Sequence, residues 1–94
     1  LVAIFIEDGQ KNLAELEQAL RRHDAEQLLL LAHTLKSVCA TYGAMVCHGE
    51  AQRLEQACRQ DNWPQMEQLV TALLQSLPAS GQALQALIAE PHLS

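Results

Sequence analysis

The chain has 94 residues, of which 49% are apolar and 3% aromatic, and its formal net charge is −5. One domain fills this length, because a second hydrophobic core needs at least about 50 further residues. The apolar content excludes a disordered chain, and four glycines and three prolines are too few for the turns of a β-sandwich or barrel. The acidic balance argues against a nucleic-acid binder, whose affinity comes from basic side chains that neutralise phosphates.

The cysteines indicate a reducing compartment. Cys39, Cys47 and Cys58 are odd in number and lie within helical patterns, whereas oxidised secreted scaffolds carry paired cysteines in loops. We expect reduced thiols that pack like small apolar groups, and a cytoplasmic location. The longest apolar runs, residues 1–6 and 28–32, are far shorter than the roughly 20 residues of a membrane span, so the domain itself is not expected to enter a membrane.

Helical periodicity of the apolar residues predicts three helices in the first two thirds of the chain. The first covers residues 1–22, with a weak point around Asp8-Gly9. The second covers residues 25–42, because Asp24 is a good N-cap and Gln27 follows it at capping-box spacing. Gly43 supplies the bend before a third helix over residues 44–59.

A fourth helix is expected to begin after the cap Asn62, with Pro64 in its first turn, where the missing N–H costs nothing. Pro78 is expected to kink or break it, with helix again over residues 79–89 and a frayed tail over residues 90–94. Short loops make successive helices antiparallel. The predicted fold is therefore an all-α, antiparallel up-down-up-down four-helix bundle, with its last helix kinked or broken near Pro78.

His33 falls outside the apolar stripe of the second helix. On a wheel of about 100° per residue with Leu28 at the origin, the stripe lies within about 60° of the origin and His33 at about 140°. The stripe consists of Leu28, Leu31, Ala32, Leu35, Cys39 and Tyr42. The helix neighbours of His33 are Lys36, Ser37 and Ala40, one cation and two small side chains that leave the ring approachable. Such an imidazole could accept a phosphoryl group, although an exposed helical histidine is more often only solvated.

The run from Ala32 to Ala44, A-H-T-L-K-S-V-C-A-T-Y-G-A, resembles the signature of histidine-containing phosphotransfer (HPt) domains. That signature reads roughly A-H-x-L-K-G-[SA]-[SA]-x-x-[hydrophobic]-G-A. The segment over residues 5–8 resembles the opening of the family's first helix, and Leu54-Glu55 resembles an L-E pair in its third. The resemblance covers nearly the whole chain and is weakest after Leu77.

The resemblance implies a four-helix bundle that shuttles phosphoryl groups between receiver-domain aspartates and is not an autonomous enzyme. It makes His33 the phospho-acceptor, through Nε2, and Lys36 the lysine that stabilises the phosphoryl group. Glu55 falls where the family has a polar residue that hydrogen-bonds the imidazole and sets its tautomer. The catalytic set implied by the resemblance is therefore His33, Lys36 and Glu55.

The partner-binding set implied by the resemblance is Ser37, Ala40, Gly43 and Arg59. Gly43 matches the family's glycine at the turn into the third helix, and Arg59 falls where some members carry a basic residue beside the site. Ser37 replaces the usual glycine after the lysine, so its Cβ and hydroxyl lie at the closest approach of a partner. They could hinder docking slightly or bond a phosphoryl oxygen.

Other residues suggest weaker alternatives. Cys39, Cys47 and His48 could be imagined as a metal site, but structural zinc sites want four ligands with short paired spacings, which this chain lacks. The pairs Glu15 with Glu17 and Glu50 with Glu55 are interpreted as solvated faces. We expect no metal and no bound cofactor in the domain, and a Mg²⁺ ion on the partner receiver.

The expected partners are response-regulator receiver domains, with no nucleic acid, and the isolated domain is expected to be a monomer. Two other functions remain open: a helical docking module that binds signalling partners without phosphorylation, and a small helical enzyme. Because the chain opens with Leu1, we expect residues 1–94 to be one domain excised from a longer protein. Our preferred parent is a bacterial hybrid sensor histidine kinase, anchored in the inner membrane, with this domain at its C-terminus.

Overall fold

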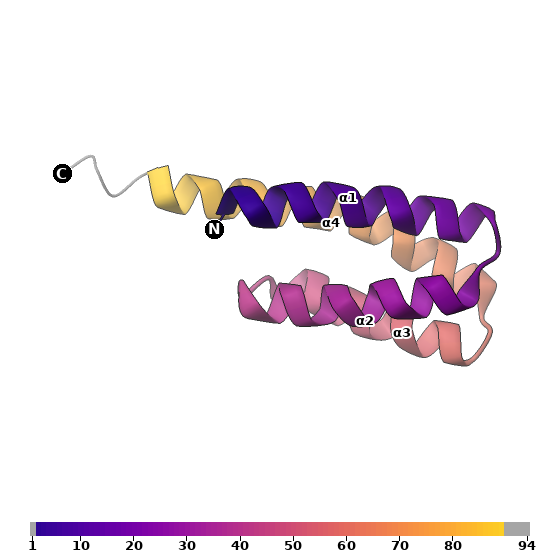
Figure 1. The fold of residues 1–94 in the computed structure, drawn as a ribbon. Coiled ribbons are helices and arrows are strands. Elements are labelled where there is room, and N and C mark those ends of the chain that lie inside the picture. The colour runs from indigo at the N-terminus through magenta and orange to yellow at the C-terminus, as the bar shows by residue number, and fades with distance from the viewer. Residues whose placement is uncertain (1, 90–94) are drawn as a thin grey trace.

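The computed structural model describes residues 2–89, which form four helices in an antiparallel bundle (Figure 1). The helices are α1 (Val2–Arg21), α2 (Ala25–Thr41), α3 (Met45–Arg59) and α4 (Trp63–Ala89). Over this part of the chain there is no strand, which confirms the predicted all-α class. The expected tail over residues 90–94 lies outside the described residues, as do the side chains of residues 1–6, 84, 85 and 87–89.

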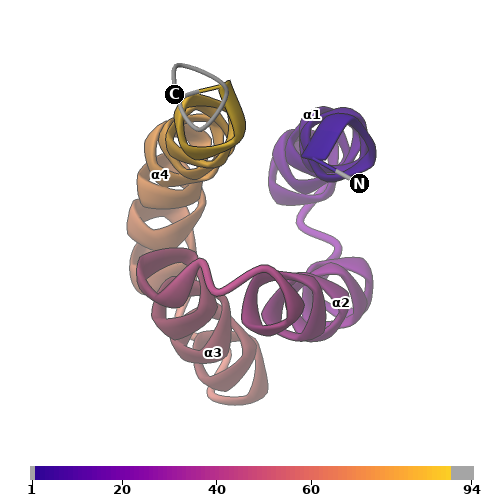
Figure 2. The same cartoon turned by 90° about the vertical axis from the view of Figure 1, so that its left-hand side faces the viewer.

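Helices that follow one another in the sequence are also neighbours around the bundle. Each helix packs against the next one, and α4 closes the ring against α1 (Figure 2). Helices α1 and α3, and likewise α2 and α4, face each other diagonally, and their backbones do not approach closely among the described residues. The α2–α3 hairpin is therefore one side of the bundle, with one face on the core and one face open.

Polar side chains fix two of the helix starts, as the sequence predicts. The Asp24 side chain accepts a hydrogen bond from the backbone N–H of Gln27 at 3.1 Å, and the Asn62 side chain accepts one from Gln65 at 3.3 Å. Each bond satisfies an N–H that has no partner inside its helix. After α2, Gly43 takes a φ of +73°, a left-handed conformation that strains other residues, and lets the chain reverse into α3.

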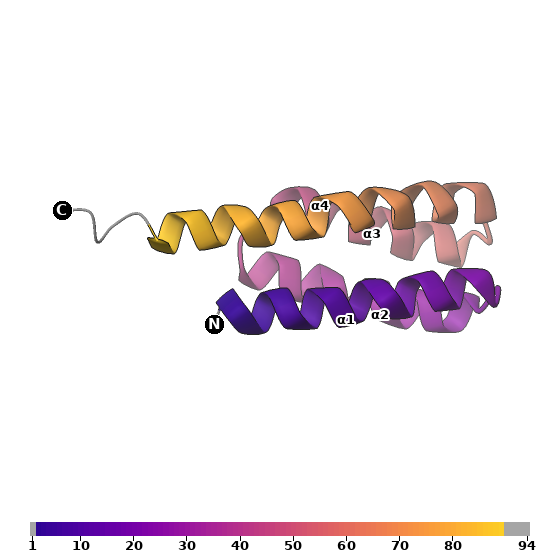
Figure 3. The ribbon, with the colours of Figure 1, turned by 90° about the horizontal axis from the view of Figure 1, so that it is seen from above.

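Helix α4 runs through Pro78 without interruption (Figure 3). Of the two outcomes expected at this residue, a kink or a break, the break is wrong. Proline removes one helical hydrogen bond, but the packing on both sides of it is retained. Leu77 is buried against α1, where Gly9 leaves room for it. A Cβ on Gly9 would lie 3.1 Å from Leu77 Cδ2. Close packing of α1 on α4 thus supports both helices where residues of low helix propensity occur, and α1 is continuous through the weak point expected at Gly9.

The core follows the predicted stripes. The largest fully buried side chains are Leu16, Leu28, Leu35, Cys39, Cys47, Leu54, Met66, Val70 and Leu73. Of the stripe expected on α2, only Tyr42 is half-buried rather than buried. All three cysteines are buried free thiols, which confirms that they pack as small apolar groups. None of the described helices carries an apolar stretch long enough to cross a bilayer.

Candidate functional site

His33 lies in the middle of α2, on the open face of the α2–α3 hairpin. Its side chain is 61% exposed, whereas its neighbours Ala32 and Leu35 are buried in the core. Those two apolar residues fix the rotation of α2, because turning the helix would expose them. The core thus holds His33 outward, as the helical wheel predicts.

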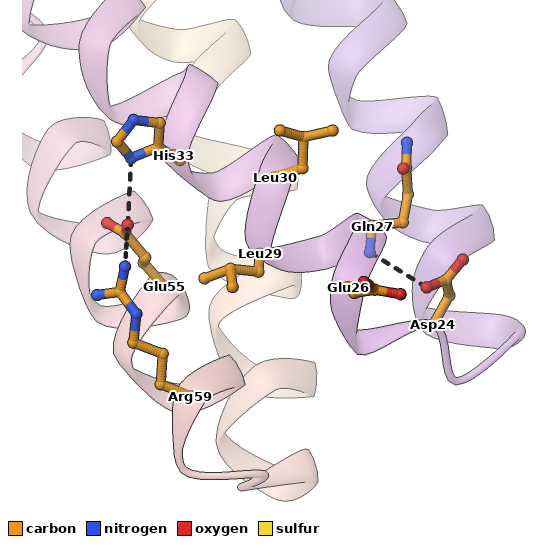
Figure 4. A pocket seen from close by; sticks show the side chains of 8 residues that line it. All are labelled: Asp24, Glu26, Gln27, Leu29, Leu30, His33, Glu55 and Arg59. Carbon is orange, nitrogen blue, oxygen red and sulfur yellow. Dashed lines mark hydrogen bonds and ion pairs between the residues drawn. The ribbon is translucent and has the colours of Figure 1, made fainter.

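Glu55 faces His33 from α3 and is almost completely buried, with 4% of its side chain exposed. One carboxylate oxygen, Oε2, lies 3.2 Å from His33 Nδ1 and accepts a hydrogen bond from the Arg59 guanidinium at 3.0 Å. The other oxygen, Oε1, accepts a hydrogen bond from the Lys36 ammonium at 2.8 Å. Figure 4 shows Glu55 between His33 and Arg59. Burial of this carboxylate is tolerated because cationic groups contact both of its oxygens.

The negative charge on Glu55 determines which nitrogen of the His33 ring carries the proton. The hydrogen bond from Lys36, assisted by the one from His33, holds the pKa of Glu55 below its ordinary value, although burial acts in the opposite direction. An ionised carboxylate only accepts hydrogen bonds, so the proton of the ring sits on Nδ1 of His33. In the neutral ring, Nε2 then carries the lone pair. This nitrogen points away from Glu55 (Figure 4), on a side chain that is mostly exposed to solvent.

The other residues expected at the site lie on the same open face. Ser37 and Ala40 are exposed on α2 on the C-terminal side of His33, and Gly43 is exposed at the turn into α3. The Arg59 side chain is 62% exposed even though it pairs with Glu55. The structure therefore brings His33, Lys36, Glu55 and Arg59 into direct contact, while the remaining three extend the surface toward the turn.

A comparison with known protein families identifies the family of the chain. The model of the Hpt domain family matches residues 1–90 of the chain. The chain belongs to the Hpt domain family. No curated protein and no solved structure matches it. Membership in the family means that the Hpt domain described here takes part in phosphotransfer within two-component signalling, with response-regulator receivers as partners.

An open hollow of about 660 Å³ lies beside His33 and continues toward the start of α2 (Figure 4). Its lining combines apolar and charged side chains: Asp24, Glu26, Gln27, Leu29, Leu30, His33, Glu55 and Arg59. Leu30, one turn before His33, is 60% exposed. This part of the Hpt domain's surface was not predicted from the sequence, although an apolar residue opposite the buried stripe of α2 was a signal for it.

The interpretation of Glu50 and Glu55 as solvated is wrong, because both side chains are buried. Glu55 can be buried as a carboxylate because Lys36 and Arg59 form ion pairs with it. Glu50 instead faces α4, where its Oε2 accepts a hydrogen bond from Ser76 at 3.3 Å, and its Oε1 has no hydrogen-bond partner among the described residues. Helical spacing alone did not show that these carboxylates lie on the packed face of α3.

His48, considered from sequence only as a metal ligand, has a different partner. Its Nδ1 lies 3.0 Å from the backbone carbonyl oxygen of Lys36, on the neighbouring helix. Cys47 lies 3.3 Å from the Ser80 hydroxyl on α4. Across residues 2–89, no group of three or more His, Cys, Asp or Glu side chains is arranged to hold a metal ion.

Proposed function

We propose that this Hpt domain accepts a phosphoryl group on Nε2 of His33 from a receiver-domain aspartate and passes it to a second receiver, in the cytoplasm. The observation that carries the proposal is the contact between His33 Nδ1 and Glu55, because it leaves Nε2 as the exposed nucleophilic nitrogen. The 61% exposure of the side chain gives two successive partners access to the same atom.

The proposed transfer needs few groups from this chain. The Nε2 lone pair attacks the phosphorus, a nitrogen–phosphorus bond forms, and the bond to the aspartate oxygen breaks, so that the aspartate leaves as a carboxylate. The proton on Nδ1 stays in place, and the positive charge that develops on the ring is stabilised by the Glu55 carboxylate at 3.2 Å. The reverse sequence returns the phosphoryl group to a second receiver.

Lys36 is proposed to bind an oxygen of the phosphoryl group. Its ammonium lies at the site through its bond to Glu55, and its side chain is 28% exposed, so an incoming anion can contact it without rearrangement of the helix. Phosphoryl transfer depends mainly on positioning and charge, and the Mg²⁺ ion that completes the charge balance is expected on the receiver. Glu55 and Arg59 act as positioning residues behind His33 and Lys36.

The receiver is proposed to cover the open face of the α2–α3 hairpin. Among the described side chains, the large apolar ones that are strongly exposed are Leu30, Met45 and Val46, and all of them lie on this hairpin. Leu30 also lines the hollow beside His33. An apolar side chain of the receiver can fill this hollow while its aspartyl phosphate meets Nε2.

Radioactive phosphate carried on a purified receiver tests the proposal. Incubation should move the label onto this domain in an acid-labile, base-stable form, as expected of a phosphorus–nitrogen bond, and His33→Gln should remove it. A docking module without phosphorylation would bind the receiver but take no label. A label that persists in His33→Gln would contradict the assignment of the acceptor.

A further inference from the structure

His48 contacts α2 directly behind the site. It lies near the start of α3, its ring is half-buried, and Nδ1 is 3.0 Å from the backbone carbonyl oxygen of Lys36. A carbonyl only accepts hydrogen bonds, so Nδ1–H is the donor. The oxygen has two lone pairs and can accept this bond in addition to the one inside the helix.

Two residues of α3 therefore form hydrogen bonds with Lys36, one with its backbone and one with the end of its side chain. His48 binds its backbone carbonyl, and Glu55 binds its ammonium at 2.8 Å. His48 and Glu55 are seven residues apart, about two helical turns, so they project from the same face of α3 toward α2. Glu55 in turn contacts His33 Nδ1 at 3.2 Å. A continuous set of contacts thus runs from His48 through Lys36 and Glu55 to His33.

We propose that His48 is a positioning residue for phosphoryl transfer, which fixes the backbone of Lys36 so that its ammonium lies beside Glu55 and His33. The inference rests on the proposed function. A lysine side chain has a long flexible stem, so the place of its ammonium depends on where its backbone is held. A shift of α2 along α3 would disturb both bonds to Glu55, and displacements of about 1 Å in a reacting geometry lower rates strongly. His48 itself does not touch the phosphoryl group.

Three substitutions separate this role from simple packing. His48→Ala removes the ring, His48→Leu keeps apolar bulk without a donor, and His48→Asn keeps an N–H donor attached to Cγ, as Nδ1 is. We expect the single-turnover transfer rate at saturating receiver to fall about three- to tenfold in His48→Ala and His48→Leu, the effect of one lost hydrogen bond. His48→Asn should restore the rate to within about twofold, and the Kd for the receiver should not change. Arg53→Ala, at an exposed position of α3 on the side turned away from His48 and Glu55, is the matched control.

A double mutant tests whether His48 acts through Lys36. If it does, His48→Ala should slow transfer no further in a Lys36→Ala background, because the group that it positions is gone. Circular dichroism confirms that each variant is folded, and if His48→Ala unfolds, His48→Leu, which keeps the apolar bulk but has no donor, replaces it in both backgrounds. Folded variants that transfer at the wild-type rate, or independent effects of His48 and Lys36, would overturn the inference. Failure of the wild-type domain to take label from any receiver would instead overturn the proposed function.

Discussion

His33 and Glu55 meet across the α2–α3 interface, with Nδ1 of the ring 3.2 Å from Oε2 of the carboxylate. This contact decides which ring nitrogen faces solvent, because an ionised carboxylate can only accept the Nδ1 proton. It also joins an exposed side chain to a buried one, so the orientation of the ring is set by the interior of the bundle.

Substitution of Glu55 should change the tautomer of His33 before it changes the fold. In Glu55→Ala no acceptor holds the proton on Nδ1, so we expect a mixture of both neutral tautomers and a slower transfer. In Glu55→Gln the amide oxygen can still accept from Nδ1, and the wild-type tautomer should predominate. Nitrogen-15 chemical shifts of the imidazole measure this directly. Identical shifts in wild type and Glu55→Ala would show that Glu55 does not set the tautomer.

Lys36→Ala should slow transfer about tenfold, since a hydrogen bond to a charged group is worth about 1.5–3 kcal/mol and partial exposure favours the low end. The fold should persist because the lysine side chain is not part of the core. Lys11→Ala, on the exposed surface of α1, is the control. The measurement is the transfer rate from one phosphorylated receiver at fixed salt. Equal rates in both variants would leave Lys36 without a role in the reaction.

The stability of the domain should depend on the ionisation of Glu55. Its pKa is lowered in the folded protein, chiefly by Lys36, so its contribution to stability is present at neutral pH and disappears as the pH falls below the ordinary carboxyl range, near about 4.3. The difference in unfolding free energy between wild type and Glu55→Gln should therefore shrink as the pH falls through that range. Urea titrations at a series of pH values test this. Glu17→Gln, at an exposed position, should show a much smaller change, and equal pH dependence would contradict the account.

Leu30→Glu should weaken receiver binding while leaving the chemistry of His33 intact. The change places a charge in the hollow that is proposed to take an apolar side chain of the receiver. We expect the Kd for the receiver to rise about tenfold or more, as at other buried apolar contacts. Labelling of His33 by the small donor phosphoramidate should not change. Val46→Glu, at a comparably exposed position outside the hollow, should have a smaller effect, and equal effects would show that the hollow has no special part in docking.

The sequence predicted what depends on helical period and local chemistry. The core stripe of α2 and the exposure of His33 follow from a spacing of about 3.6 residues, and the starts of α2 and α4 follow from Asp24 and Asn62. The uninterrupted course of α4 through Pro78 could not be predicted in this way. It depends on Leu77 packing against Gly9, a residue far away in the sequence.

In the site, too, some features follow from local sequence and others depend on packing between helices. Single-helix spacing places Lys36 near His33, but the burial of Glu55 depends on how α3 packs on α2 and on cations brought from both helices. Only the resemblance to HPt domains pointed to its contact with His33. The bond of His48 to a backbone carbonyl carries no side-chain signal on the α2 side, because any residue at position 36 would offer the same oxygen. Contacts of this kind become visible only in the structure.

Phosphorus–nitrogen coupling in the phosphorylated domain tests most directly whether Nε2 of His33 carries the phosphoryl group. Nuclear magnetic resonance of the nitrogen-15-labelled domain, recorded after phosphorylation by a receiver, should show phosphorus coupled to Nε2 of a single histidine, His33. The signal should be absent in His33→Gln, which should fold and melt like wild type, and it should persist when His23 is replaced instead. Phosphorus on Nδ1, on another histidine, or on no histidine in a domain that binds its receiver would contradict the claim.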